Sequence, residues 1–200
     1  MYMTMFTANM REKESVKAYR LYKDRQKLHR CLCIAAGNQK REDINLLYDC
    51  FLDRDRIIIY VQSLTEIKDE VPGFQKKDTI IIDSIIQKLN TGSVLSFSLK
   101  TCPFKSQAGK KFYLANDSER MNWLARQGEK YGFSLMNAVE TREEDIYFMH
   151  KEDCGGNGRQ SVYKYNGALT ITDGELFKKA FVSGIGRCKA YGLGLVKIGV

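Results

Sequence analysis

Hydrophobic and polar positions alternate along the first half of the chain in a pattern typical of strands and helices. Short apolar or alternating runs predict three strands, at residues 1–6, 57–61 and 94–99. A helix is expected after Asp24, because this residue type often begins helices and the apolar residues that follow it have helical spacing: Leu28, Leu32 and Ala35. The apolar segment 79–89 is compatible with either a strand or a helix.

The second half repeats this order. A helix is predicted from Asn116 to Tyr131, ended by Gly132, and another begins after Asp173. The last strand but one is expected to be broken by a turn at Asn166-Gly167. The predicted strands of this half are 111–115, 134–139, 146–150, 161–172 and 193–198.

Each half therefore approaches the order strand, helix, strand, strand, helix, strand. This order predicts an α+β fold of two tandem ferredoxin-like (RRM-like) domains with antiparallel sheets. We expect the first domain at residues 1–100 and the second at 110–200. Residues 101–109 would form the linker, because Cys102-Pro103 and the polar residues after it interrupt the pattern.

Positive charge is concentrated in three stretches of the chain. The formal net charge is +8, but residues 11–30 alone carry eight positive and three negative side chains. Residues 101–130 carry six against three, and residues 176–200 carry five against none. If folding gathers these stretches, they form a surface that binds polyanions with a salt-dependent affinity. The alternative is that these lysines are ordinary solvent-exposed side chains that bind no polyanion.

The six cysteines have no CxxC spacing, and no apolar run approaches the ~20 residues of a membrane span. The N-terminus does not have the pattern of a signal peptide. We therefore expect free thiols, a cytoplasmic location and no membrane partner. His29 and Cys33 stand four residues apart on the predicted helix, but no further ligands cluster near them, so no metal site is expected.

The segment from Gly184 to Gly194 combines glycine with positive charge. Its glycines permit left-handed backbone and close approach, and they stand at positions 184, 186, 192 and 194. Free backbone amides beside Arg187 and Lys189 would make a phosphate cradle, with Ile185 and Leu193 anchoring the ends in a core. The segment has no GKS/T ending, so it is not a Walker loop. A tight connection between a helix and a strand is the alternative.

The same segment, GIGRCKAYGLGLVKI, resembles the C-terminal signature of the CasE-type CRISPR repeat-processing endoribonucleases of type I-E systems. Other segments are similar to this family in the same order along nearly the whole chain: VQS, FSLKTCP, WLARQGEKYGF and NGALTITD. The resemblance implies two ferredoxin-like domains that bind the hairpin of CRISPR repeat RNA. It also implies a single cut without metal or other cofactor, in which the 2′-hydroxyl attacks the phosphate and leaves a 2′,3′-cyclic phosphate. The enzyme would then stay on the mature CRISPR RNA (crRNA), together with the other subunits of the Cascade complex.

The resemblance also implies site residues. His29 occupies the position of the family's catalytic histidine, and Lys151 is the candidate for a lysine that approaches the scissile phosphate. The sequence departs from the family at Gln26, where a tyrosine often stands one turn before the histidine. The expected RNA-binding residues are Arg25, Arg30, Lys105, Lys110, Lys111, Arg159, Gly184, Gly186, Arg187, Lys189, Gly192 and Gly194.

Two other functions are compatible with the sequence. A non-catalytic subunit of a ribonucleoprotein complex could bind an RNA hairpin with the same cations, and Gln26 is compatible with this alternative. An unrelated ferredoxin-like protein could use the glycine-rich segment only as a connection. The sequence has no RNP-type octamer, which favours a duplex contacted through its phosphates over bases stacked on a sheet.

Overall fold

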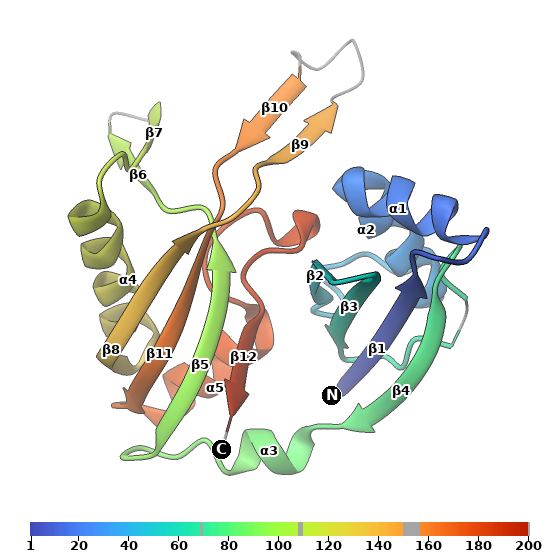
Figure 1. Ribbon diagram of the computed structural model, residues 1–200. Helices are drawn as coiled ribbons and strands as arrows, with labels where there is room; N and C mark the ends of the chain where they lie inside the picture. Colours follow the sequence, from blue (N-terminus) through green and yellow to red (C-terminus); the bar gives the residue numbers. More distant parts are fainter. Residues whose placement is uncertain (69, 108–109, 150–156, 200) are drawn as a thin grey trace. The chain divides into compact units, whose positions relative to one another are not determined.

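The computed structural model describes residues 1–68, 70–107, 110–149 and 157–199, which divide into two compact units. Unit 1 comprises Met1–Asp83, Ile146–Gln160 and Lys189–Gly192. Unit 2 comprises Ser84–Asp145, Ser161–Cys188 and Leu193–Val200. The chain therefore passes back and forth between the units rather than completing one before it starts the other (Figure 1).

Unit 1 is an antiparallel sheet of four strands in the order β2-β3-β1-β4, covered by two helices. The helices pack on the strands through apolar residues that include Leu28, Leu32, Phe6 and Ile59. A short hairpin and a 3-10 turn from later in the chain complete the unit. Its elements are β1 (Tyr2–Asn9), α1 (Ser15–Lys23), α2 (Arg25–Ala35), β2 (Leu47–Asp53), β3 (Arg56–Ser63), β4 (Gln75–Ile81), β9 (Ile146–Met149), β10 (Asn157–Gln160) and the 3-10 helix η2 (Lys189–Tyr191).

Unit 2 has a second antiparallel sheet, in the order β12-β5-β11-β8, with two long helices and an inserted hairpin. Phe133 and Phe177 meet edge to face, with ring centroids 5.9 Å apart, where the sheet and the last helix pack together. The elements are α3 (Asp83–Gln87), which starts at the boundary, β5 (Val94–Thr101), β6 (Phe104–Gln107), β7 (Lys110–Tyr113), α4 (Asp117–Tyr131), β8 (Phe133–Arg142), β11 (Tyr163–Ile171), α5 (Gly174–Ser183) and β12 (Val196–Gly199).

Both sheets have the strand order of a ferredoxin-like fold, and the α+β class with antiparallel sheets is confirmed. Unit 2 also has a helix in each of the two expected places. Unit 1 departs from the pattern: the described residues that join β3 to β4, 64–68 and 70–74, contain no helix. The expected helix between β1 and β2 is instead two helices, which meet at Asp24.

The division between the units differs from the expected domains 1–100 and 110–200 with a linker at 101–109. β5 falls within the expected first domain, but it pairs with β11 and β12 along its length and belongs to unit 2. Its buried residues Leu95, Phe97 and Leu99 alternate because one face of β5 lies on the core of that unit. The strand expected at 111–115 is not the first strand of the unit, because β7, among the strands that the structure describes, pairs with β6 alone.

Two further local predictions were wrong or incomplete. Asn166-Gly167 is not a turn, because both residues lie inside the continuous strand β11. A Cβ atom on Gly167 would lie 2.1 Å from the carbonyl oxygen of Asn137, so glycine permits a close approach of β8 there. The segment 79–89, which was compatible with a strand or a helix, includes both: the end of strand β4 and, after it, helix α3.

The helix ends agree with the sequence predictions. The side chain of Asn116 accepts a hydrogen bond from the backbone of Glu119 at the start of α4, and Gly132 ends this helix with a φ of 73°. Asp173 caps α5 in the same way, accepting from Glu175 and Leu176. All five cysteines within the described ranges are free thiols. No helix among the described residues is long and apolar enough to cross a membrane.

Candidate functional site

Helix α2 carries the candidate catalytic histidine. Asp24 starts the helix, because its side chain accepts a hydrogen bond from the backbone of Lys27 at 3.0 Å. Leu28 and Leu32 are fully buried in the core of unit 1 and fix the rotation of the helix about its axis. His29 follows Leu28 at the edge of this buried face and is half-buried, as its position next to the apolar stripe predicts.

The surroundings of His29 favour its neutral form. Burial lowers the pKa of His29, and the positive charges of Arg41 and Arg30 lower it further, whereas Glu42 acts in the opposite direction. The thiol of Cys33 lies 3.8 Å from Nδ1 and 3.9 Å from Nε2 of the ring. Among the described residues, no group of three or more potential ligands could hold a metal ion. A neutral imidazole at the surface of α2 can accept a proton from a bound substrate.

Arg25 is held inside unit 1 rather than extended toward solvent, which departs from its expected role as an exposed phosphate contact. Its Nη2 donates to the carbonyl oxygen of Cys50 at 3.0 Å, and its guanidinium stacks on the ring of Tyr22 at 4.6 Å. Its Nη1 is buried and has no hydrogen-bond partner among the described residues. These contacts fasten the first turn of α2 to β2, so Arg25 supports the helix of His29. Arg30, by contrast, is exposed.

The glycine-rich segment is divided between the two units. Gly184 to Cys188 and the residues from Leu193 onward belong to unit 2, whereas Lys189–Gly192 belongs to unit 1. Ile185 and Leu193 are both buried, which confirms that they anchor the segment. All four glycines have left-handed backbone: φ is 77° at Gly184, 90° at Gly186, 81° at Gly192 and 87° at Gly194.

Close packing explains two of these glycines. A Cβ on Gly186 would lie 2.6 Å from the hydroxyl oxygen of Thr101, within unit 2. A Cβ on Gly192 would lie 2.7 Å from the ring of Tyr48, within unit 1. A side chain at either position would therefore displace a buried neighbour.

The expected cradle of free amides is only partly present. The amides of Gly184, Ile185, Gly192 and Gly194 all donate to backbone carbonyl oxygens of the protein, with donor-to-acceptor distances of 2.7–3.2 Å. These four amides hold the shape of the segment and are not available to a phosphate. Arg187 and Lys189 are its cations: Arg187 is exposed and stacks on Phe104 at 4.5 Å, and Lys189 begins η2.

Tyr48 joins the two parts of unit 1 on which the site depends, and the sequence prediction did not include it. Its buried hydroxyl donates to the carbonyl oxygens of Arg25 in α2 and Ala190 in η2, each at 3.1 Å. Burial raises the pKa of Tyr48 well above its usual value, so the phenol keeps its proton and remains a donor. A tyrosine within an apolar strand needs a partner for its hydroxyl, which was the available signal, but the sequence does not identify the partner.

The other predicted residues fall into two groups. In unit 1, Arg159 is exposed on β10 and lies over the ring of Tyr147 at 6.0 Å, and the partner strand β9 lies against α2. In unit 2, Lys105 pairs with Glu119 at 3.4 Å and is the neighbour of Phe104, on which Arg187 stacks. Lys110 and Lys111 lie on β7. Lys151 lies outside the described residues.

Comparisons with known proteins agree on one family. A family profile described as CRISPR associated protein matches residues 1–199. The CRISPR-associated endoribonuclease Cse3 of Thermus thermophilus is 28% identical over 121 residues, which cover 55% of this chain and 57% of that relative. Because the match spans little more than half of this relative, the activity of the whole protein does not follow from it.

Two solved structures resemble the chain over its full length. The CRISPR endoribonuclease Cse3 bound to a 19-nucleotide RNA has a TM-score of 0.84 and 26% identity, with all of both chains covered. A chain of a CRISPR RNA-guided surveillance complex, described as pre-nicking, has a TM-score of 0.74 and 20% identity, again over all of both chains. At its lower identity, the second match shows a shared fold only.

The first prediction concerns the charge that Arg41 places near His29. Arg41→Gln should raise the pKa of His29, because a positive charge is removed and Glu42 loses its ion-pair partner at 2.9 Å. NMR titration of the two histidine ring signals, with His29→Ala for assignment, measures the shift. Arg56→Gln removes an exposed charge that does not act on His29 and should leave the titration unchanged. An unchanged midpoint in Arg41→Gln would contradict the proposed electrostatics.

The second prediction compares two glycines of unit 1 that have nearly the same left-handed backbone. Gly37→Ala, at φ 85°, meets only the flexible end of Gln39 at 3.7 Å and should cost about 1 kcal/mol of unfolding free energy. Gly192→Ala, at φ 81°, should cost about 1–3 kcal/mol more, because its Cβ would collide with Tyr48. Denaturant unfolding measures both variants. Equal losses would mean that the contact with Tyr48 does not constrain η2.

Proposed function

The chain belongs to the CRISPR-associated protein family whose profile matches residues 1–199, and on that premise we propose that it is an endoribonuclease that processes precursor CRISPR RNA. The observation that carries the proposal is His29, a half-buried histidine on a helix held by core packing, with a pKa lowered by burial and by the cations Arg41 and Arg30. The relatives named endoribonuclease Cse3, one of them with bound RNA, support the same reaction class.

The reaction proposed is transesterification within the RNA strand. Neutral His29 takes the proton of a 2′-hydroxyl, whose oxygen then attacks the adjacent phosphorus. The bond to the 5′-oxygen of the next nucleotide breaks, and this oxygen receives a proton as it leaves. The products are a 2′,3′-cyclic phosphate and a 5′-hydroxyl, and no metal ion takes part. Lys151 is proposed to stabilise the charge that develops on the phosphate, with Arg159 behind it.

Gln26 separates this chain from the usual pattern of the family. It stands three residues before His29, one turn away on α2, and is half-buried. Its amide can donate to a phosphate oxygen and orient the scissile group, but unlike a phenol it has no acidic proton to transfer at neutral pH. We expect slower cleavage as a result. A slow single cut is sufficient for an enzyme that keeps its product.

The RNA is proposed to be the hairpin of the CRISPR repeat, held by cations that contact its phosphates. In unit 1 these are Arg30, Arg159 and Lys189, and in unit 2 they are Lys105, Lys110, Lys111 and Arg187. Arg25 and the glycines at 184, 186, 192 and 194 contribute indirectly, by fixing α2 and the glycine-rich segment. The enzyme would act in the cytoplasm and remain on mature crRNA as a Cascade subunit, which the fold shared with a surveillance-complex chain supports.

The third prediction tests the role of His29. In EDTA, the wild type should cleave the cognate repeat RNA once, and His29→Ala should cleave it about a hundredfold more slowly or worse, with RNA binding retained. His150→Ala removes the other histidine of the chain and serves as the matched control, with wild-type cleavage expected. Denaturing gels with end-labelled RNA measure the cleavage rate. A 2′,3′-cyclic phosphate is identified when the 3′ end of the product cannot be ligated at first, but can be ligated after acid has opened the ring and phosphatase has removed the phosphate.

The same experiment discriminates the alternative, a non-catalytic subunit that only binds the hairpin. Gln26 is the observation that favours this alternative, because it stands where the family that the sequence resembles often has a tyrosine, one turn before the histidine. If neither the wild type nor His29→Ala cuts the RNA while both bind it, the binding subunit becomes the better proposal. If both cut equally, the RNA is processed but His29 is not the base.

A further inference from the structure

The thiol of Cys33 lies against the ring of the candidate catalytic histidine. Its Sγ is 3.8 Å from Nδ1 and 3.9 Å from Nε2 of His29, and both side chains are half-buried. The contact follows from the geometry of α2, because Cys33 stands four residues after His29 on the same face of the helix. Side chains of a helix lean toward its N-terminus, so the thiol leans over the turn that carries the ring.

The two distances show how the sulfur meets the ring. The hydrogen-bonding directions of the two imidazole nitrogens lie in the ring plane and diverge from each other. A thiol that bonded to one nitrogen along its own direction would be much farther from the other nitrogen. Because the two distances are nearly equal, the sulfur faces the ring between the nitrogens. Cys33 therefore supports the ring and does not take the place of a substrate at either nitrogen.

Both groups of this pair are uncharged at neutral pH. Burial raises the pKa of the Cys33 thiol, and Arg41 and Glu42 act on this pKa in opposite directions. Burial is also the largest cause of the lowered pKa of His29. A carboxylate partner would orient a histidine ring as well, but its negative charge would raise the pKa of the imidazole. A neutral thiol orients the ring and leaves it ready to accept a proton.

We propose that Cys33 is a positioning residue, whose thiol holds the ring of His29 in the orientation that presents a nitrogen to the RNA. A half-buried histidine can turn about two side-chain bonds, and the contact with Cys33 restricts this rotation. Orientation matters because a misplacement of about 1 Å can slow an enzymatic reaction about a hundredfold. The inference rests on the proposed function, since a fixed ring is needed only if His29 takes a proton from the RNA.

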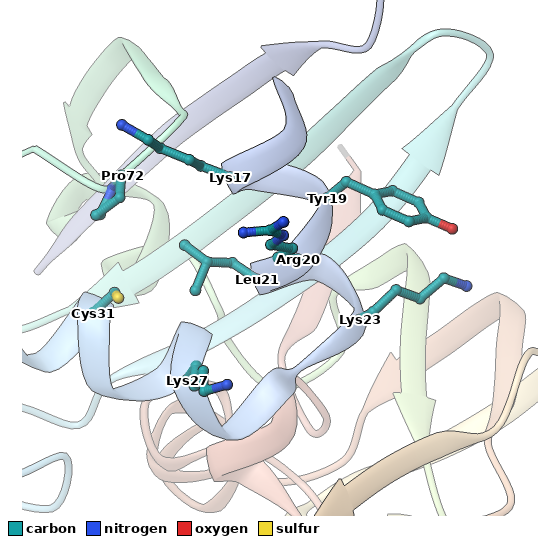
Figure 2. Close-up of a pocket in the computed structure, with 8 residues that line it drawn as sticks. All are labelled: Lys17, Tyr19, Arg20, Leu21, Lys23, Lys27, Cys31 and Pro72. Carbon is teal, nitrogen blue, oxygen red and sulfur yellow. The ribbon is translucent and has the colours of Figure 1, made fainter. Parts of the chain in front are cut away.

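Cys31 provides a matched control on the same helix. It is also a half-buried thiol, and burial raises its pKa as well. Cys31 is two residues away from both His29 and Cys33, which corresponds to a rotation of about 200° around α2. It lines a concavity between α1, α2 and the loop at Pro72 (Figure 2). Cys31→Ala therefore removes a thiol from α2 without touching the contact with His29.

The first measurement is the pKa of His29 in the full chain, obtained by NMR titration of its ring signals. Cys33→Ala should raise this pKa toward the ordinary value of histidine, because water gains access to the ring. Cys31→Ala should leave it unchanged. The charges that act on His29 are the same in all three proteins: Arg30, Arg41 and Glu42. Titratable groups on the elements that pack against α2 are also unchanged, among them Tyr22, Tyr147 and Lys189.

The second measurement is single-turnover cleavage of the repeat RNA at saturating protein. Cys33→Ala should cut about tenfold more slowly with unchanged RNA affinity, because the ring loses its support. Cys33→Val fills the space without a thiol and should recover most of this loss, whereas Cys31→Ala should stay within about twofold of the wild type. The rate rises as His29 loses its proton, so the raised pKa in Cys33→Ala should also move the acidic limb of the pH–rate profile to higher pH.

The proposal is overturned if Cys33→Ala leaves either the pKa of His29 or the cleavage rate unchanged. Equal losses in Cys33→Val and Cys33→Ala would also overturn it, because the thiol would then act chemically rather than as a support. Thermal unfolding confirms that the variants fold. The wild type keeps this test separate from the proposed function. If the wild type does not cut the RNA, the endoribonuclease is contradicted; if it cuts and Cys33→Ala cuts equally fast, only the role of Cys33 is contradicted.

Discussion

The hydroxyl group of Tyr48 makes the contact on which the arrangement of unit 1 depends. It is fully buried, and its one proton is shared between the carbonyl oxygens of Arg25 and Ala190. The first acceptor belongs to the helix that carries His29, and the second belongs to the 3-10 turn of the glycine-rich segment. Because a buried hydroxyl without a partner costs about 1–3 kcal/mol, the strand, the helix and the turn are favoured in one relative position. Arg25 reinforces this position from the helix side through the carbonyl oxygen of Cys50.

Positive side chains of the candidate site can act in two ways: they can attract an anion, and they can change the pKa of His29. Four amides of the glycine-rich segment hold its shape by donating to backbone carbonyl oxygens and are not available to an anion, whereas the side chain of Arg187 offers an exposed cation. Near His29, the cations Arg30 and Arg41 also act on the histidine itself and favour the form that accepts a proton. The same positive charge that would attract a phosphate therefore also favours the neutral, proton-accepting form of His29. Both effects weaken with salt, but the effect on the half-buried His29 is screened less.

Local features of the structure are predictable from the sequence because their causes are local. Asp24 and Asn116 cap their helices through hydrogen bonds to residues three positions ahead, and Gly132 ends α4 within its own turn. The boundary between the units is not predictable in this way because it depends on which strands pair: β5 joins β11, more than sixty residues away. Gly167 resembles a turn residue in sequence, but its role is set by the neighbouring strand at Asn137. In the candidate site, the resemblance to a family motif points to His29, whereas the hydrogen bond of Tyr48 reaches Ala190, 142 positions away, and leaves no local pattern in the sequence.

The interleaving of the two units has a consequence for biosynthesis. The sheet and helices of unit 1 are translated first, but the turn that Tyr48 holds, Lys189–Gly192, is translated after α5 of unit 2. A nascent chain therefore carries His29 on its helix long before the segment that packs beside that helix has left the ribosome. Domains ordinarily fold as units in the order of their synthesis, and this chain does not permit that order. A polypeptide released before η2 is made cannot complete unit 1, so only chains that extend past η2 can assemble the candidate site in full.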